Sequence, residues 1–154
     1  MKPSVYIETT ILSYLVSRPS RDLIVAGKQE ITRDWWEFSR ARFDLVVSQI
    51  VLDEISAGDQ EHAKNRMRHA AKLSALEITQ PAVDLAQAIQ KRGLIPPGEV
   101  RDALHISVAT VSRIDYLLTW NCKHIANAPI IRQLEKYVKT YGYDLPLICT
   151  PESL

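Results

Sequence analysis

Short runs of β-prone apolar residues alternate with longer stretches of helical spacing, and this alternation limits the fold more than any other feature of the sequence. The expected strands cover residues 4–7, 43–48, 75–79, 115–120 and 145–150. The expected helices cover residues 11–16, 21–42, 49–58, 59–74, 81–91, 99–113 and 129–142. Strands that alternate with helices predict an α/β fold with a mainly parallel sheet. The runs "DYLLTW" and "LVVS" fit that sheet, since strands between two helical layers are apolar on both faces.

Length and charge limit the classes of protein that this chain can belong to. Its 154 residues are 46% apolar and 24% charged, so a single domain spanning residues 1–154 is expected. The formal net charge is only +1, so any polyanion partner would have to be met by a local patch. Two cysteines do not make a disulfide framework, and neither a signal peptide nor a membrane span is recognisable. We therefore expect a cytoplasmic protein without membrane contact.

Polar side chains stand at the ends of the expected strands or in the helices beside them. They are Glu8 after the first strand, Asp53 and Glu54 after the second, Asp102 before the fourth, and Asn121 after the fourth. In open α/β sheets, ligands bind outside the carboxyl ends of the strands, so these positions are candidates for a site. Each has a simpler explanation as well. Glu8 could lie in a surface turn, and Asp102 could complement the dipole of its helix.

Taken together, acids at three of these positions and an amide at the fourth indicate an oxygen-rich metal site. Carboxylates and water select hard ions such as Mg²⁺ or Mn²⁺. Without an ion, clustered carboxylates would repel and raise one another's pKa. Asp102 carries the most weight, because its helix is otherwise apolar around most of its circumference and a buried charge is costly unless paired or bound to metal. The predicted centre suits phosphate-ester chemistry.

Four segments of the chain resemble the PIN-domain ribonucleases, in the form of the VapC toxins of prokaryotic toxin–antitoxin pairs. The segments are "VYIETTILSYL", "VSQIVLDEISAGD", "RDALHISVA" and "YLLTWNCKHIAN", and the resemblance covers essentially the whole chain. It implies a three-layer α/β/α fold with a mainly parallel sheet of four or five strands. It also implies a metal-dependent endoribonuclease that hydrolyses RNA phosphodiester bonds and has an antitoxin protein as its partner. A homodimer is a further expectation.

The resemblance assigns roles to the acidic positions. Glu8, Glu54 and Asp102 take the family's first three acidic positions and would hold Mg²⁺ or Mn²⁺. Asn121 completes the catalytic set at a position where the family has Asp or Asn. The first residue is usually Asp, and Glu8 is one methylene longer; with the neutral Asn121, three carboxylates remain rather than four. These two departures favour an alternative, in which a PIN-like domain with weakened or lost catalysis binds RNA or protein.

Four more polar residues near these positions are candidates for substrate binding: Thr119, Lys123, His105 and His124. Lys123 is the basic residue nearest in sequence to Asn121 and is expected to meet a phosphate. His105 lies one helical turn after Asp102, where it would orient a ligand or touch substrate. A satisfied histidine of the hydrophobic core is the alternative for His105.

The neighbouring Trp35 and Trp36 indicate where a partner protein could bind. Core packing accounts for one of them, and the other is expected to line a groove for a partner helix or a second subunit.

Two other classes of protein fit poorly. A phospho-acceptor domain needs Asp where the chain has Glu8, and the five glycines form no GxGxxG or P-loop pattern for a nucleotide.

Overall fold

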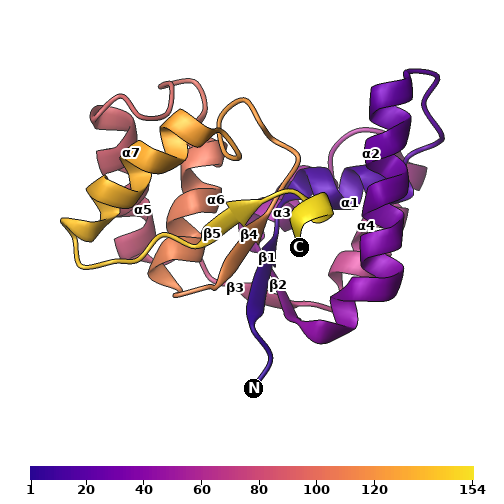
Figure 1. Cartoon of the computed structure of the whole chain (residues 1–154), viewed down its shortest axis with the longest axis horizontal. Coiled ribbons are helices and arrows are strands. Elements are labelled where there is room, and N and C mark those ends of the chain that lie inside the picture. Colours follow the sequence, from indigo (N-terminus) through magenta and orange to yellow (C-terminus); the bar gives the residue numbers. More distant parts are fainter.

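The computed structural model describes all 154 residues and contains one five-stranded sheet with the order β3-β2-β1-β4-β5 (Figure 1). The strands are β1 (Ser4–Ile7), β2 (Asp44–Ser48), β3 (Ser74–Leu76), β4 (Tyr116–Leu118) and β5 (Leu147–Cys149). Every pair of neighbouring strands is parallel, which confirms the prediction of a parallel α/β sheet. β1 is the central strand, so the segment that follows it emerges between the ends of β2 and β4.

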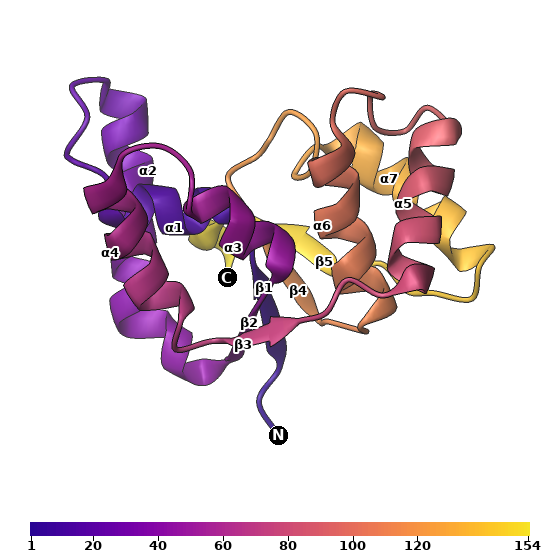
Figure 2. The ribbon, with the colours of Figure 1, turned by 180° about the vertical axis from the view of Figure 1, so that it is seen from behind.

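Seven helices cover this sheet: α1 (Thr9–Val16), α2 (Leu23–Asp34), α3 (Gln49–Ile55), α4 (Gln60–Ala70), α5 (Gln80–Lys91), α6 (Val100–Val111) and α7 (Ala128–Lys139). Figures 1 and 2 show α1 to α4 on one side of the sheet and α5 to α7 on the other. The strand order explains this, because right-handed crossovers change face when the chain turns from β3 back to β4. The three-layer α/β/α architecture is thereby confirmed.

The strand order reverses between β1 and β4, which makes this point the topological switch of the sheet. In register, Ile7 pairs with Leu118, and the next residue, Glu8, donates its backbone N–H to the Leu118 carbonyl at 3.1 Å. Residues that follow the two strands therefore lie side by side at the carboxyl edge. This is the place where an α/β sheet of this kind binds its ligand.

The expected long helix over residues 21–42 is broken into three parts. The α-helical part ends at Asp34, a π-helical turn covers Trp35–Ser39, and a 3-10 turn covers Arg40–Arg42. Both tryptophans are buried in the core, so the expectation that one of them lines a surface groove is wrong. The wider π turn changes the angular position of successive side chains, and with it both indoles face inward.

The core is one contiguous cluster of 29 buried apolar residues that includes the central strand β1 and the middle of α6. Val5, Tyr6 and Ile7 have no solvent exposure at all, as expected for a strand covered on both faces. None of the helices combines the length and the apolar character that crossing a membrane would need.

Candidate active site

Glu8 is a buried carboxylate fixed by three hydrogen bonds. It is the N-cap residue of α1, and its side chain accepts from the Thr10 backbone N–H at 3.2 Å. The hydroxyls of Thr10 and Thr119 each donate to Oε1 at 2.5 Å. Only 4% of Glu8 is exposed. A carboxylate is favourable at a helix N-terminus, and here hydrogen-bond donors take the place of a salt bridge.

The two threonine hydroxyls are held in turn by the backbone after β4. Trp120 N–H donates to Thr10 Oγ1 at 2.8 Å, and Asn121 N–H donates to Thr119 Oγ1 at 2.9 Å. Thr119 has no solvent exposure, and its hydroxyl is committed to Glu8. The structure therefore places Thr119 behind the carboxylate rather than on a surface that substrate could touch.

Glu54, on α3, points toward the same region. Its Oε1 accepts from Thr9 Oγ1 at 2.8 Å and faces His105 Nε2 at 2.6 Å. Burial alone would raise the pKa of Glu54, but the hydrogen bond and charge of His105, the Thr9 bond and the charge of Arg101 together lower the pKa below its usual value. Glu54 is accordingly a carboxylate that stays ionised at neutral pH. Asp53, the adjacent acid, is exposed and accepts only from Gln49.

A buried hydrogen-bond chain stands behind Glu54. His105 Nδ1 lies 2.7 Å from Tyr6 Oη, and Tyr6 Oη lies 2.6 Å from Ser48 Oγ. Burial raises the pKa of Tyr6 above its ordinary value, so its phenol stays protonated. His105 thus connects the two, with Nε2–H donating to Glu54 and Nδ1 facing the Tyr6 hydroxyl.

His105 is fully buried, and both of its ring nitrogens have partners. This is the geometry of a satisfied core histidine, which was the alternative to a substrate contact. The side chain nevertheless orients Glu54, so its place in the core and its place beside the site are compatible.

A second group of side chains with metal-ligand chemistry lies where the start of α6 meets the loop after β4. Donor atoms of Glu99, Asp102 and His124 lie within 4.8 Å of one another. His124 Nδ1 is 2.9 Å from Asp102 Oδ2, and the backbone N–H of His124 donates to Asn121 Oδ1 at 3.0 Å. We name this set the Asp102 cluster. Donor atoms of Glu8, Glu54 and His105 likewise lie within 4.8 Å of one another, and we name these residues the Glu8 cluster.

The two clusters are neighbours in the fold. Asp102 and His105 lie one turn apart on α6, which places their side chains on the same face of the helix. Thr119, which binds Glu8, and Asn121, which binds His124, are two residues apart after β4. The structure therefore joins three predicted acids and Asn121 at one edge of the sheet, as two clusters rather than one shell.

The donor set fits a hard divalent cation. Glu54 Oε2 and Asp102 Oδ1 accept no hydrogen bond from the protein, and Glu8 Oε2 accepts only one. Each carboxylate thus keeps an oxygen with capacity for a ligand, and oxygen donors are those that Mg²⁺ and Mn²⁺ prefer.

Two residues of the site depart from the sequence-based prediction. Glu99 was not predicted, although it stands three residues before Asp102, a spacing that places two side chains on one helix face. Lys123 is exposed on the loop after β4 and forms no hydrogen bond or ion pair. Lys123 is therefore close to Asn121 in the sequence, but it pairs with none of the carboxylates of the site.

Comparison with solved structures finds the same architecture in toxin–antitoxin proteins. VapBC2 from Rickettsia felis, solved with a DNA fragment from its promoter, matches with a TM-score of 0.59 and 15% identity over 96% of this chain and 98% of that chain. A toxin–antitoxin complex from Klebsiella pneumoniae matches with a TM-score of 0.58 and 17% identity over 96% and 97%. The chain has the VapC-type PIN-domain fold.

A third structure with this fold is VapC20 from Mycobacterium tuberculosis, a toxin that cleaves the sarcin–ricin loop. It matches with a TM-score of 0.56 and 12% identity over 78% of this chain and 92% of that chain. A scan against protein-family models finds no match. A search among curated proteins finds none either. The similarity to these structures therefore concerns the fold. At 12–17% identity it does not show that the side chains of the site have the same roles.

Proposed function

We propose that the protein is a metal-dependent endoribonuclease that hydrolyses RNA phosphodiester bonds and is the toxin of a toxin–antitoxin pair. The observation that carries this proposal is a pair of neighbouring clusters, one with Glu8 and Glu54 and the other with Asp102, at the switch point of a VapC-type PIN-domain fold. Clustered carboxylates repel one another, and a bound cation offsets that repulsion. VapC20, which shares the fold, is itself a toxin that cleaves the sarcin–ricin loop.

In this proposal, Glu8, Glu54 and Asp102 hold Mg²⁺ or Mn²⁺, and Asn121 belongs to the catalytic set. The bound ion supplies polarisation of a phosphoryl oxygen and activation of a water as nucleophile. The protein's own residues fix the carboxylates: Thr10 and Thr119 hold Glu8, the Tyr6–His105 pair holds Glu54, and His124 holds Asp102. Lys123 and Arg101 supply positive charge for the phosphate backbone.

The test is cleavage of RNA by an Asp102→Ala variant, with Asp53→Ala as the matched control. Asp53 is an exposed carboxylate beside Glu54 that belongs to neither cluster. Asp102→Ala should abolish cleavage that depends on Mg²⁺ or Mn²⁺ and is stopped by EDTA, while circular dichroism shows that the protein still folds. Asp53→Ala should cleave as the wild type does. Full activity of Asp102→Ala would refute the assignment.

A second candidate function is a PIN-like domain that binds RNA or protein without cleaving. Glu8 favours it, because three donors already use much of the capacity of its carboxylate. The neutral Asn121 favours it as well, since its side-chain oxygen accepts from His124. Calorimetry with Mn²⁺ separates the two functions. The nuclease binds the ion and cleaves RNA, whereas the binding module retains RNA affinity in EDTA and cleaves nothing.

We further propose an antitoxin protein as partner, a cytoplasmic location and a homodimer. Two similar structures are toxin–antitoxin assemblies, and Leu23, Ile24 and Phe38 give this chain large exposed apolar side chains on and beside α2. Coexpression with the product of a neighbouring short reading frame, followed by purification through a tag on that product, tests the partner. Light scattering of the purified chain tests the dimer.

A further inference from the structure

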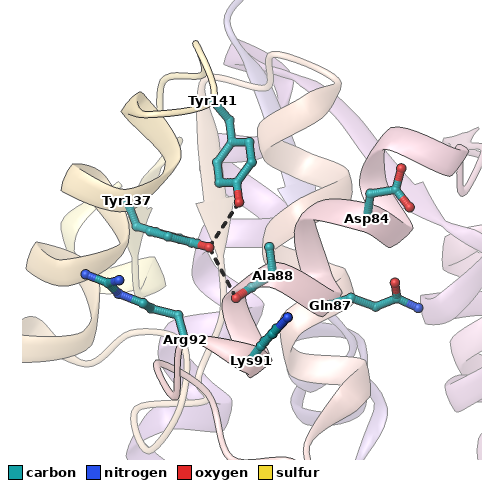
Figure 3. A pocket seen from close by; sticks show the side chains of 7 residues that line it. All are labelled: Asp84, Gln87, Ala88, Lys91, Arg92, Tyr137 and Tyr141. Atoms are coloured by element: carbon teal, nitrogen blue, oxygen red, sulfur yellow. Dashed lines mark hydrogen bonds between the residues drawn. The ribbon is translucent and has the colours of Figure 1, made fainter.

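A groove lies between α5 and the end of α7 (Figure 3). Its volume is about 610 Å³, and its lining residues are Asp84, Gln87, Ala88, Lys91, Arg92, Tyr137 and Tyr141. A second hollow, which shares Arg92 and Tyr137, extends it toward Lys136. We name the whole depression the α5–α7 groove. None of the proposed metal ligands lines it.

Two tyrosines, Tyr137 and Tyr141, line the groove. Tyr137 Oη lies 3.1 Å from Tyr141 Oη and donates to the Ala88 carbonyl at 3.4 Å, and the two rings meet edge to face with centroids 5.4 Å apart. Tyr141 is 52% exposed. Figure 3 shows both hydroxyls turned toward each other, with the Tyr141 ring standing above them. The Tyr141 ring is therefore half exposed and open to a ligand.

Three cations surround these rings, and none of them has an acidic partner. Lys91, Arg92 and Lys136 form no salt bridge within 4.0 Å. The Arg92 guanidinium lies 5.6 Å from the Tyr137 ring centroid, which orients it at the groove wall. The single acid of the groove, Asp84, already accepts from Gln80 at 2.8 Å.

Three other arginines of the chain are committed to structure. Arg66 donates to the carbonyls of Ile55 and Ala57, and Arg42 donates to the Leu154 carbonyl. Arg33 pairs with Glu30 and donates to the Ser17 carbonyl. The groove cations differ from these because their charge is not used within the protein.

Unpaired cations around an exposed aromatic ring suit single-stranded nucleic acid, which offers phosphates to the cations and a base face to the ring. A local patch is needed, because the net charge of +1 gives no attraction over the whole surface and the candidate active site is itself acidic. The groove has a suitable position. Lys91 and Arg92 end α5, and the loop 93–99 leads from them directly to Glu99 and Asp102 at the start of α6 (Figure 1).

We propose that the α5–α7 groove is an accessory RNA site, in which Arg92 and Lys136 bind phosphates and Tyr141 stacks on a base. This inference rests on the proposed ribonuclease function and extends it, because it assigns the contacts that hold the strand away from the scissile bond. An acidic protein segment is the competing ligand, and it lacks the base face that the exposed Tyr141 ring would meet.

The test measures binding of a fluorescently labelled single-stranded RNA by anisotropy, with Asp102→Asn in every sample to stop cleavage. Adding Arg92→Gln and Lys136→Gln together should raise Kd at least tenfold. It should also reduce the slope of log Kd against log salt by about 1.4, since each phosphate contact on a single strand contributes about 0.7. The matched control is Lys64→Gln with Arg68→Gln, which removes the same charge from α4 and should leave Kd within about twofold of the parent.

Tyr141 provides a second measurement that does not change charge. Tyr141→Ala should weaken RNA binding about fivefold or more, whereas Tyr141→Phe, which keeps the ring, should bind like the parent. Unchanged binding by the groove variants while the wild type still cleaves RNA would overturn the groove proposal alone. No RNA binding and no cleavage by the wild type would overturn the proposed function. Groove variants that change the mass in light scattering, but not the RNA affinity, would show a protein interface and also overturn the groove proposal.

Discussion

The two clusters of the candidate site differ in how firmly the protein holds them. In the Glu8 cluster, Glu8 and His105 are buried, and donors from strands and helices far apart in sequence fix both. In the Asp102 cluster, Glu99 is exposed, and His124 comes from a loop. The first half of the site is therefore preorganised. The second half is built on a helix start and a loop, where side chains adjust when an ion or substrate binds.

This difference predicts that mutations in the two clusters separate stability from activity. Glu8→Ala should abolish cleavage, by about 10³-fold or more, as loss of a metal ligand does. It should also lower the free energy of unfolding by about 2 kcal/mol, because it removes the α1 cap and leaves the buried Thr119 hydroxyl without its acceptor. Asp102→Ala should lose as much activity but change stability by only about 0.5 kcal/mol. Urea unfolding in EDTA measures both, and equal losses of stability would contradict the distinction.

A smaller effect is expected behind Glu54. Tyr6→Phe removes the hydroxyl between Ser48 and His105, so it should cost about 1–3 kcal/mol of stability. Because His105 would lose its Tyr6 partner and hold Glu54 less firmly, Mn²⁺ binding should also weaken about tenfold. Electron paramagnetic resonance of Mn²⁺ measures this affinity independently of activity. Tyr14→Phe is the control, because the half-buried Tyr14 hydroxyl has no partner; an equal change in both variants would show that only packing was disturbed.

The length of Glu8 can be tested by shortening it. Glu8→Asp keeps a good N-cap residue, but the carboxylate should no longer reach Thr119 as well as Thr10. We expect cleavage to slow about tenfold and stability to fall by about 1 kcal/mol. Single-turnover cleavage rates decide the point. Faster cleavage than the wild type would mean that the extra methylene is a handicap and that the Glu8 cluster is not preorganised for catalysis.

The smallest expected effect concerns pH. Burial would raise the pKa of Glu54, but His105, Thr9 and Arg101 outweigh it and hold the folded pKa below the ordinary 4.5. A carboxyl with a lowered folded pKa adds stability that is fully present above its unfolded pKa and is lost as pH falls through the folded value. The unfolding free energy in EDTA should therefore decline below about pH 4.5, and Glu54→Gln should decline less steeply. Parallel curves for the two proteins would contradict this assignment.

Much of the site could be predicted from strand ends alone. The first strand ends before Glu8, the fourth before Asn121, and parallel strands bring their carboxyl ends to one edge. The side chains that hold these acids in place could not be predicted. Thr119 is 111 residues from Glu8, and His105 is 51 residues from Glu54, so their hydrogen bonds depend on how the layers pack. Glu99 was missed for the same reason, since its neighbour His124 comes from a distant loop.

The sequence by itself determined the order of strands and helices, the parallel sheet and the edge at which the acids gather, because hydrophobic periodicity and strand ends are local properties. It did not determine the π turn that turns both tryptophans inward, the division of the acids into a buried and an open cluster, or the unpaired cations of the α5–α7 groove. Those features depend on which side chains meet across the layers. Only tertiary packing decides that, because burial and hydrogen-bond satisfaction are settled between residues far apart in the chain.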